Sequence, residues 1–201
     1  MNKLLVLGIG LVLLAGPAAG QGMPTAEEID KAIEQAIEQL PTVTAEAEEA
    51  AGKLGVTITH KDLPTDPVEM VTRMPNLPPQ VAQNTGMIKS YLPQAMPYLA
   101  KHLEMIGQLT TEHPLKLGST TIPAGDYDFG LVMVKGEYQP EALVIKGEKL
   151  AKPVYVQLQT KKTPDTFPNL KLKLQAKGDK VWVLLGWGQT ISKSASLQVK
   201  K

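Results

Sequence analysis

The clearest indication of the fold is the segment Leu170-Lys171-Leu172-Lys173-Leu174-Gln175. Apolar and polar residues alternate strictly, so the three leucines point to one side of an extended chain and the polar residues to the other. Gly178-Asp179 then supplies a turn, and residues 181–187 follow as a second, almost wholly apolar run. The pattern predicts two antiparallel strands whose leucine side fills a core.

Short alternating runs of apolar and polar residues also recur at regular intervals after Pro114, separated by Gly, Pro and Asp. We expect strands at residues 115–121, 127–134, 142–145, 154–159, 170–176, 181–187 and 192–199. Strands at this spacing are typical of a sandwich or barrel. The predicted fold is therefore α+β, with an antiparallel β-sandwich of about seven strands at residues 115–201 and N-terminal helices packed on it.

The run at residues 181–187 differs from its neighbour because it is apolar on both faces, which is usual for a strand that is covered on both sides. An apolar stripe with helical spacing at residues 80–109 predicts an amphipathic helix as the cover. We expect this helix to pack near Trp182 and Leu184 and to break at Pro93 and Pro97, which lack a backbone donor.

The first 20 residues have the three parts of a signal peptide. Lys3 is followed by an apolar run to Ala15, and Ala18-Ala19-Gly20 provides small residues for cleavage. The run is shorter than the roughly 20 residues that a membrane-spanning helix needs. We therefore expect residues 1–20 to be removed, leaving a periplasmic or secreted protein without a transmembrane segment.

Two segments lie between the signal and the predicted sandwich. We expect residues 21–55 to form a helical segment, with one helix at residues 25–40 and a short one at residues 44–51. Thr25 and Glu28 have the spacing of a capping box. Residues 56–114 contain a strand at residues 56–60, a proline-rich linker at residues 63–79 with one helical turn near Val68, and the broken amphipathic helix.

Composition excludes several functions. The chain has no cysteine, so thiol chemistry and disulfides are ruled out. Its formal net charge of +1 falls to zero once Lys3 is removed, and Arg73 is the only arginine. Arginine is the residue best suited to bidentate recognition of phosphates and bases, so we expect no nucleic-acid partner.

Residues 117–129, which include Ile122-Pro123-Ala124-Gly125-Asp126-Tyr127, resemble the Ala-Gly-x-Tyr strand entry of a family of exported bacterial proteins known only as a domain of unknown function. Residues 183–188, ending in Gly186-Trp187-Gly188, are similar to its late strand. The resemblance covers about residues 115–199, and it implies a β-sandwich and export. The resemblance implies no catalytic residues. The long helical segment before residue 115 departs from the compact pattern of the family.

No motif predicts an enzyme. His60, His102 and His113 lack the spacing of a zinc site, and the serines lack a nucleophile elbow. We expect no metal and no cofactor. Asp126 and Asp128 lie two apart, hence on one face of a strand, and could serve a hydrolase or bind calcium. A solvated strand face opposite a core face formed by Tyr127 and Phe129 is the simpler interpretation.

Aromatic residues are the best candidates for binding. Tyr155, Trp182 and Trp187 could present flat rings to sugars; burial beneath the amphipathic helix is the alternative.

These sequence features lead to three hypotheses for the function. The first is an exported non-catalytic module that contacts an unknown protein or envelope partner. The second is a carbohydrate-binding module that uses Tyr155 and Trp182, and the third is a hydrolase that uses Asp126 or Asp128.

Overall fold

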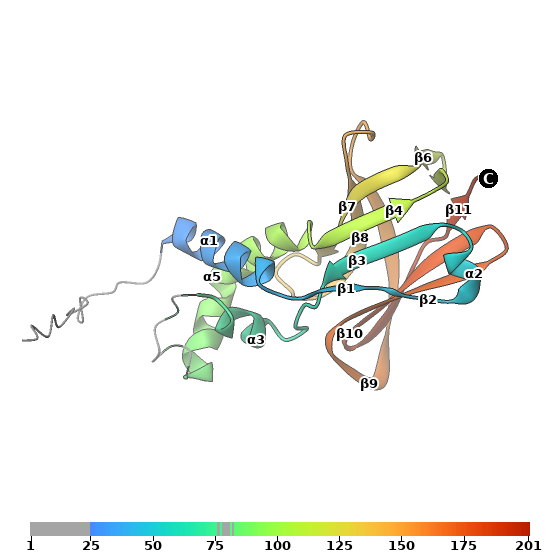
Figure 1. Ribbon diagram of the computed structural model, residues 1–201. Coiled ribbons are helices and arrows are strands. Elements are labelled where there is room, and N and C mark those ends of the chain that lie inside the picture. Colours follow the sequence, from blue (N-terminus) through green and yellow to red (C-terminus); the bar gives the residue numbers. More distant parts are fainter. Residues whose placement is uncertain (1–24, 76, 78–80, 82) are drawn as a thin grey trace, which may run out of the picture.

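The computed structural model describes residues 25–75, 77, 81 and 83–201. The predicted signal peptide at residues 1–20 lies outside the described residues. Figure 1 shows helices gathered at one end of the molecule and the strands at the other. The chain is a mixed α+β protein built on one open, predominantly antiparallel sheet of 11 strands. No described helix is long and apolar enough to cross a membrane.

The helical end contains α1 (Ala26–Glu38), α3 (Pro67–Thr72) and α5 (Thr85–Leu103). The predicted capping box is confirmed, because Glu28 N donates to Thr25 Oγ1 and Thr25 N donates to Glu28 Oε2. The helix α1 packs on α5 through its buried isoleucines, and α5 packs on α3 and on the sheet.

The prediction for residues 80–109 is partly wrong. The helix α5 runs without interruption through Pro93 and Pro97, both exposed. The buried residues Ile88, Ala95 and Leu99 flank the prolines on the opposite side, so tertiary packing holds the helix although two donors are missing. The helix also ends at Leu103, well before residue 109.

Residues 107–111 are the strand β4 (Gly107–Thr111), which pairs with β3 (Val56–Lys61) and with β7 (Gly125–Met133). A Cβ on Gly107 would collide with the carbonyl oxygen of Thr59, so this close approach needs glycine. Leu109 fits a helical stripe by spacing alone, whereas Gly107 and the β-branched pair Thr110-Thr111 favour the strand.

The expected helix at residues 44–51 is also largely wrong. The segment forms β1 (Thr42–Thr44), β2 (Glu46–Ala47) and a single turn, α2 (Glu49–Gly52). The strand β1 pairs with β3, and β2 pairs in parallel with β9 (Val154–Lys177). These backbone hydrogen bonds to two distant strands outweigh the helical propensity of a short, alanine-rich segment.

The remaining strands follow the sequence prediction in type but not in number. They are β5 (Leu115–Leu117), β6 (Thr120–Ile122), β8 (Pro140–Lys146), β10 (Lys180–Ser194) and β11 (Leu197–Val199). The predicted runs 154–159 and 170–176 merge into β9, and the run 181–187 merges with the start of the run 192–199 into β10, while the rest of that last run is β11. The strands β9 and β10 form one long hairpin with Gly178 at positive φ in its turn. We call this hairpin the β9–β10 ribbon.

The β9–β10 ribbon bends where its register shifts, between Gly186 and Thr190. Gly188 has a φ of 55°, which favours glycine. After the bend, Ser194 returns beside the start of β10, since its Oγ accepts a hydrogen bond from Val183 N at 2.9 Å. The N-terminal part of β9 pairs with β8. The ribbon therefore connects the half of the sheet that contains β7 and β8 to the half that contains β10 and β11.

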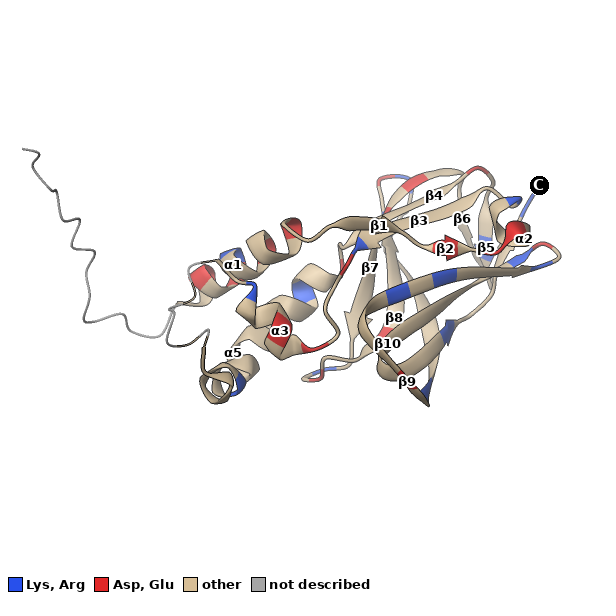
Figure 2. Cartoon of the chain, turned by 60° about the horizontal axis from the view of Figure 1, so that its bottom comes forward, with Lys and Arg blue, Asp and Glu red and all other residues tan. Residues whose placement is uncertain are grey.

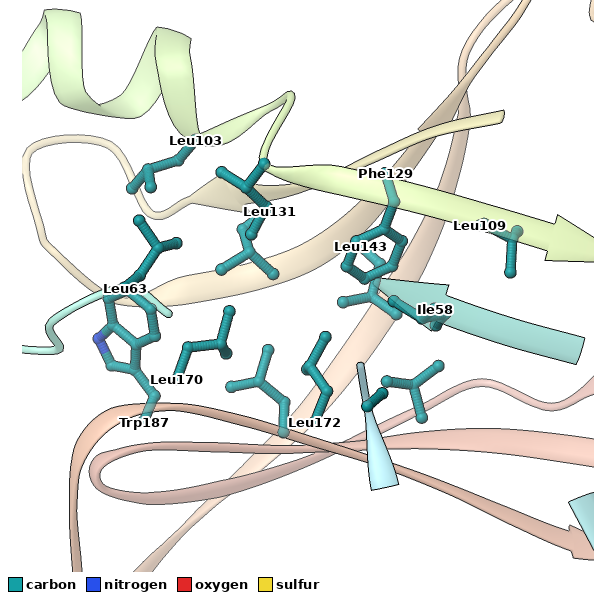
Figure 3. Close-up of a cluster of buried hydrophobic side chains, with 14 of the residues drawn as sticks. Ile58, Leu63, Leu103, Leu109, Phe129, Leu131, Leu143, Leu170, Leu172 and Trp187 are labelled. Atoms are coloured by element: carbon teal, nitrogen blue, oxygen red, sulfur yellow. The ribbon is translucent and has the colours of Figure 1, made fainter. Parts of the chain in front are cut away.

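The core lies between these two halves of the sheet, as Figure 3 shows for ten labelled side chains. The prediction of inward-facing leucines is confirmed, because Leu170, Leu172 and Leu174 are all buried. Tyr127 and Phe129 are buried on the opposite half, also as predicted. A small apolar cavity of about 10 Å³ remains among side chains of both halves. It is about the size of one water molecule and has no polar group to hold one.

Candidate binding surface

The predicted helical cover over Trp182 is not formed. The helix α5 lies against α1, α3 and β7 instead, because the chain enters β4 at Ile106, whose N–H donates to Phe129 O at 2.9 Å. Glu104 crosses the sheet over Gly130, where a Cβ would collide with the backbone of Glu104. The cover therefore falls on β7, and the side chains of Trp182 and Leu184 on β10 are partly exposed.

Lysines surround Trp182 on this outer face. Lys171 and Lys173 alternate with the buried leucines of β9 and so point outward. Lys177 lies directly opposite Lys180 in the register, and the two therefore share a face. The same row continues from Lys180 through Gln198 of β11 to Lys116 of β5.

The returning half of β10 brings further cations to the same side. Lys193 lies between the buried Ser192 and Ser194 and is exposed. Its Nζ is 4.6 Å from the centroid of the Trp182 ring, which joins the two halves of the ribbon across the bend. Lys161 is one position from Thr160, the cross-strand partner of Ser192, and is also exposed. We call this surface the lysine face, and it consists of Lys116, Lys161, Lys171, Lys173, Lys177, Lys180 and Lys193.

Acidic groups do not balance the lysine face. Of its members, Lys173 alone forms an ion pair within the described part of the chain, with Glu48 Oε1 at 3.4 Å. Residues 149–201 carry eleven lysines and two acids, whereas residues 25–148 carry nine basic residues and eighteen acids. Figure 2 shows basic residues along the β9–β10 ribbon and acidic residues on α1, α3, β2 and α2.

The net charge of the chain does not reveal this surface, because a total of +1 conceals a basic C-terminal part and an acidic N-terminal part. Counting charges by segment would have found the asymmetry. It would not have placed the lysines on one face, because that depends on the bend in the ribbon.

The three predicted binding residues lie in different surroundings. Trp187 is buried at 2 % exposure, and its Nε1 donates to Tyr138 O at 2.8 Å. The Tyr138 ring packs on it with centroids 5.0 Å apart, and burial raises the pKa of the Tyr138 hydroxyl. Tyr155 is 50 % exposed. Only Trp182 lies within the lysine face.

Tyr155 and Trp182 share the outer side of the sheet without forming one platform. Tyr155 lies on the same face of β9 as Gln157 and Gln159, and Gln159 is the cross-strand partner of Lys193. Gln159 is four positions along β9 from Tyr155, which corresponds to roughly 13 Å along a strand. A single small ligand could not stack on both rings, whereas an extended polymer could reach both.

The predicted carboxylate pair lies elsewhere. Asp126 and Asp128 are exposed on the side of β7 opposite Tyr127 and Phe129. Asp126 Oδ1 accepts a hydrogen bond from Thr110 Oγ1 at 2.7 Å. The hydrolase hypothesis gains no support from this placement.

The histidines occupy three separate environments. His60 is buried in β3, and its Nδ1 lies 2.8 Å from Lys61 O. His102 Nε2 lies 2.6 Å from Asp30 Oδ1, so this side chain helps to join α5 to α1. Hydrogen bonds from Lys101 and His102 lower the pKa of the Asp30 carboxyl. Among the residues described, no three His, Asp or Glu side chains are grouped to hold a metal ion.

Comparison of the chain with protein-family models, curated proteins and solved structures found no match.

Proposed function

We propose that this protein is an exported, non-catalytic binding protein that uses the lysine face to contact an anionic component of the cell envelope. One observation carries the proposal. Six of the seven lysines on this face have no ion-pair partner among the described residues, although the chain is rich in acids elsewhere.

The arrangement of Lys177 and Lys180 supports a role in binding. Like charges directly opposite each other on neighbouring strands destabilise a sheet. A protein that only had to fold would gain from an acid at either position. An anionic ligand would instead turn this repulsion into favourable contacts with both ammonium groups.

The proposal includes a compartment and a finer fold. The signal-like residues 1–20 favour a periplasmic or secreted location. The core between the two halves of the sheet is consistent with a β-sandwich, and the resemblance of residues 115–199 to an exported family points in the same direction. Membership of that family remains a prediction.

The test is co-sedimentation of the cleaved chain with bacterial envelope fragments, at low and at high salt. We expect binding at low salt that high salt removes, because screening weakens contacts between exposed charges. Replacing Lys171, Lys180 and Lys193 by glutamate should abolish most of the binding. Replacing Lys31, Lys89 and Lys135 makes the same charge change at exposed sites away from the lysine face and should leave most of it. Equal losses in the two triple variants would overturn the proposal.

A carbohydrate-binding module is the second candidate, and the exposure of Tyr155 and Trp182 on the outer side of the sheet favours it. Exposed aromatic rings provide apolar surface on which sugar rings can stack. The two candidates are compatible, since an envelope ligand can be both anionic and saccharide.

A further inference from the structure

We propose that the lysine face binds an acidic polysaccharide, and that a sugar ring takes the place of Lys193 over the indole of Trp182. This inference rests on the proposed function and adds the chemical class of the ligand and the residues that distinguish it from other polyanions.

The first step concerns the indole. Trp182 points outward and is only partly buried, and in the free protein Lys193 Nζ lies over its ring, 4.6 Å from the centroid. A cation over an aromatic ring at an exposed site is held weakly. Lys193 is exposed and its side chain is flexible, so a nearby carboxylate can draw the ammonium group off the ring. The uncovered indole face is then available to an apolar ring surface.

The second step concerns hydroxyl groups. Gln175 lies directly opposite Trp182, and Gln159 lies directly opposite Lys193. Side-chain amides donate and accept hydrogen bonds, which suits sugar hydroxyls. Gln175 Nε2 donates to Glu48 Oε1 at 3.0 Å, which fixes the amide beside the indole.

The third step concerns the length of the ligand. Lys171 and Lys173 are two residues apart on β9, which spaces their side chains by roughly 6.7 Å along the strand. The row from Lys177 to Lys116 crosses four strands at roughly 4.8 Å per strand. Cations repeated in this way over a sheet face match a polymer with regularly spaced carboxylates better than a small ion.

Other polyanions fit less well. A membrane surface would favour protruding apolar side chains among the lysines, yet the large apolar residues that are well exposed in the described chain are Met87, Met105 and Tyr155, none of them in the lysine face. Nucleic-acid phosphates would favour arginine, and the sole arginine, Arg73, lies in the helical end.

The test is a fluorescence titration of the cleaved chain with polygalacturonate, a polymer of uronic acid. The chain has two tryptophans, and Trp187 is buried, so a change in emission on binding reports mainly on Trp182. We expect saturable binding to polygalacturonate and none to neutral dextran. Trp182→Ala should weaken binding at least tenfold, and Trp182→Phe should remove the emission change while keeping most of the affinity.

Lys193→Met gives a second test that does not remove the indole. It keeps a long side chain and deletes the charge, and it should weaken binding to polygalacturonate at least threefold. Tyr155→Ala, a matched aromatic deletion on the same side of the sheet outside the lysine face, should have a smaller effect than Trp182→Ala. Unfolding midpoints equal to that of the wild type would show that the variants are folded.

Dextran sulfate and vesicles of phosphatidylglycerol serve as competing polyanions. If either binds as tightly as polygalacturonate, or if Trp182→Ala leaves the affinity unchanged, the ligand is recognised by charge alone and this inference is overturned. The proposed function would then still stand, because it depends on the separate loss of envelope binding in the Lys171, Lys180 and Lys193 variant.

Discussion

At the scale of single residues, alternation along β9 decides which side chains fill the core and which meet the solvent. Leu172 is 3 % exposed, while its neighbour Lys171 is exposed. The two residues share a strand, a backbone conformation and a position near the middle of the ribbon. They therefore form a matched pair for separating burial from strand propensity.

Leu172→Ala should lower the free energy of unfolding by about 2–5 kcal/mol, because it deletes buried methyl groups and leaves a cavity. Lys171→Ala should change it by no more than about 0.5 kcal/mol, because its side chain is solvated. Urea unfolding of both variants measures the difference. Equal costs would show that the assignment of inner and outer faces is wrong.

His60 is the residue whose burial has a consequence for pH. Burial lowers its pKa below the ordinary value of 6.5, which the unfolded chain retains. The unfolded state therefore binds more protons than the folded state as the pH falls below 6.5, so stability is full above this value and declines below it. His60→Gln should show a smaller loss of unfolding free energy than the wild type between pH 7.5 and pH 5.5. Parallel losses in the two proteins would contradict a buried, neutral His60.

At the scale of elements, α5 keeps two prolines that do not interrupt it. Pro93 is exposed and removes the donor that would reach the carbonyl of Lys89. The helix tolerates the loss of this hydrogen bond because Ile88, Ala95 and Leu99 are buried on its other side. The helix is thus held by packing and not by its local sequence.

Pro93→Ala should therefore stabilise the protein by about 1–3 kcal/mol, because it restores a hydrogen bond and a residue of high helix propensity. Thermal unfolding measures the gain, and slower amide exchange in α5 locates it. A loss of stability would mean that the proline ring itself makes contacts that the helix needs.

At the scale of the whole molecule, residues 42–47 link the two halves of the sheet. The strand β1 pairs with β3 on one half and β2 pairs with β9 on the other. Glu48 N also donates to Leu174 O at 3.0 Å. The helix α1, by contrast, packs mainly on α5 and adds no strand.

A chain that begins at residue 39, without α1, should keep a cooperative unfolding transition and the circular dichroism of a β protein. A chain that begins at residue 53 should lose cooperativity and bind a hydrophobic dye, since it leaves β3 and β9 with open edges and uncovers the core. Similar behaviour of the two shortened chains would contradict a linking role for residues 42–47.

The segregation of charge is also a property of the whole molecule. Acids dominate α1, α3 and the segment of β2 and α2, and lysines dominate the β9–β10 ribbon. Glu48 brings the two together at Lys173 and Gln175. The asymmetry gives a protein with a formal net charge of only +1 a strongly basic face, which can orient it on an anionic surface.

The local features could be predicted from the sequence alone. Alternation identified the core leucines of β9, the turn at Gly178-Asp179 and the buried face of β7, and the spacing of Thr25 and Glu28 identified the start of α1. These features depend on neighbours along the chain, and their periodicity or hydrogen bonding can be read directly. The aromatic candidate Trp182 was also found in this way, as an apolar residue on the outward side of a strand.

The positions of the long-range partners became known from the folded chain. Residues 44–47 pair with strands instead of forming a helix, α5 covers β7 instead of Trp182, and Leu109 joins a strand. The bend of the ribbon at Gly186 to Thr190 then brings Lys193 onto Trp182 and gathers lysines from distant positions on one face. The physical reason is that these contacts join segments far apart in sequence, and periodicity within one segment does not specify its partner.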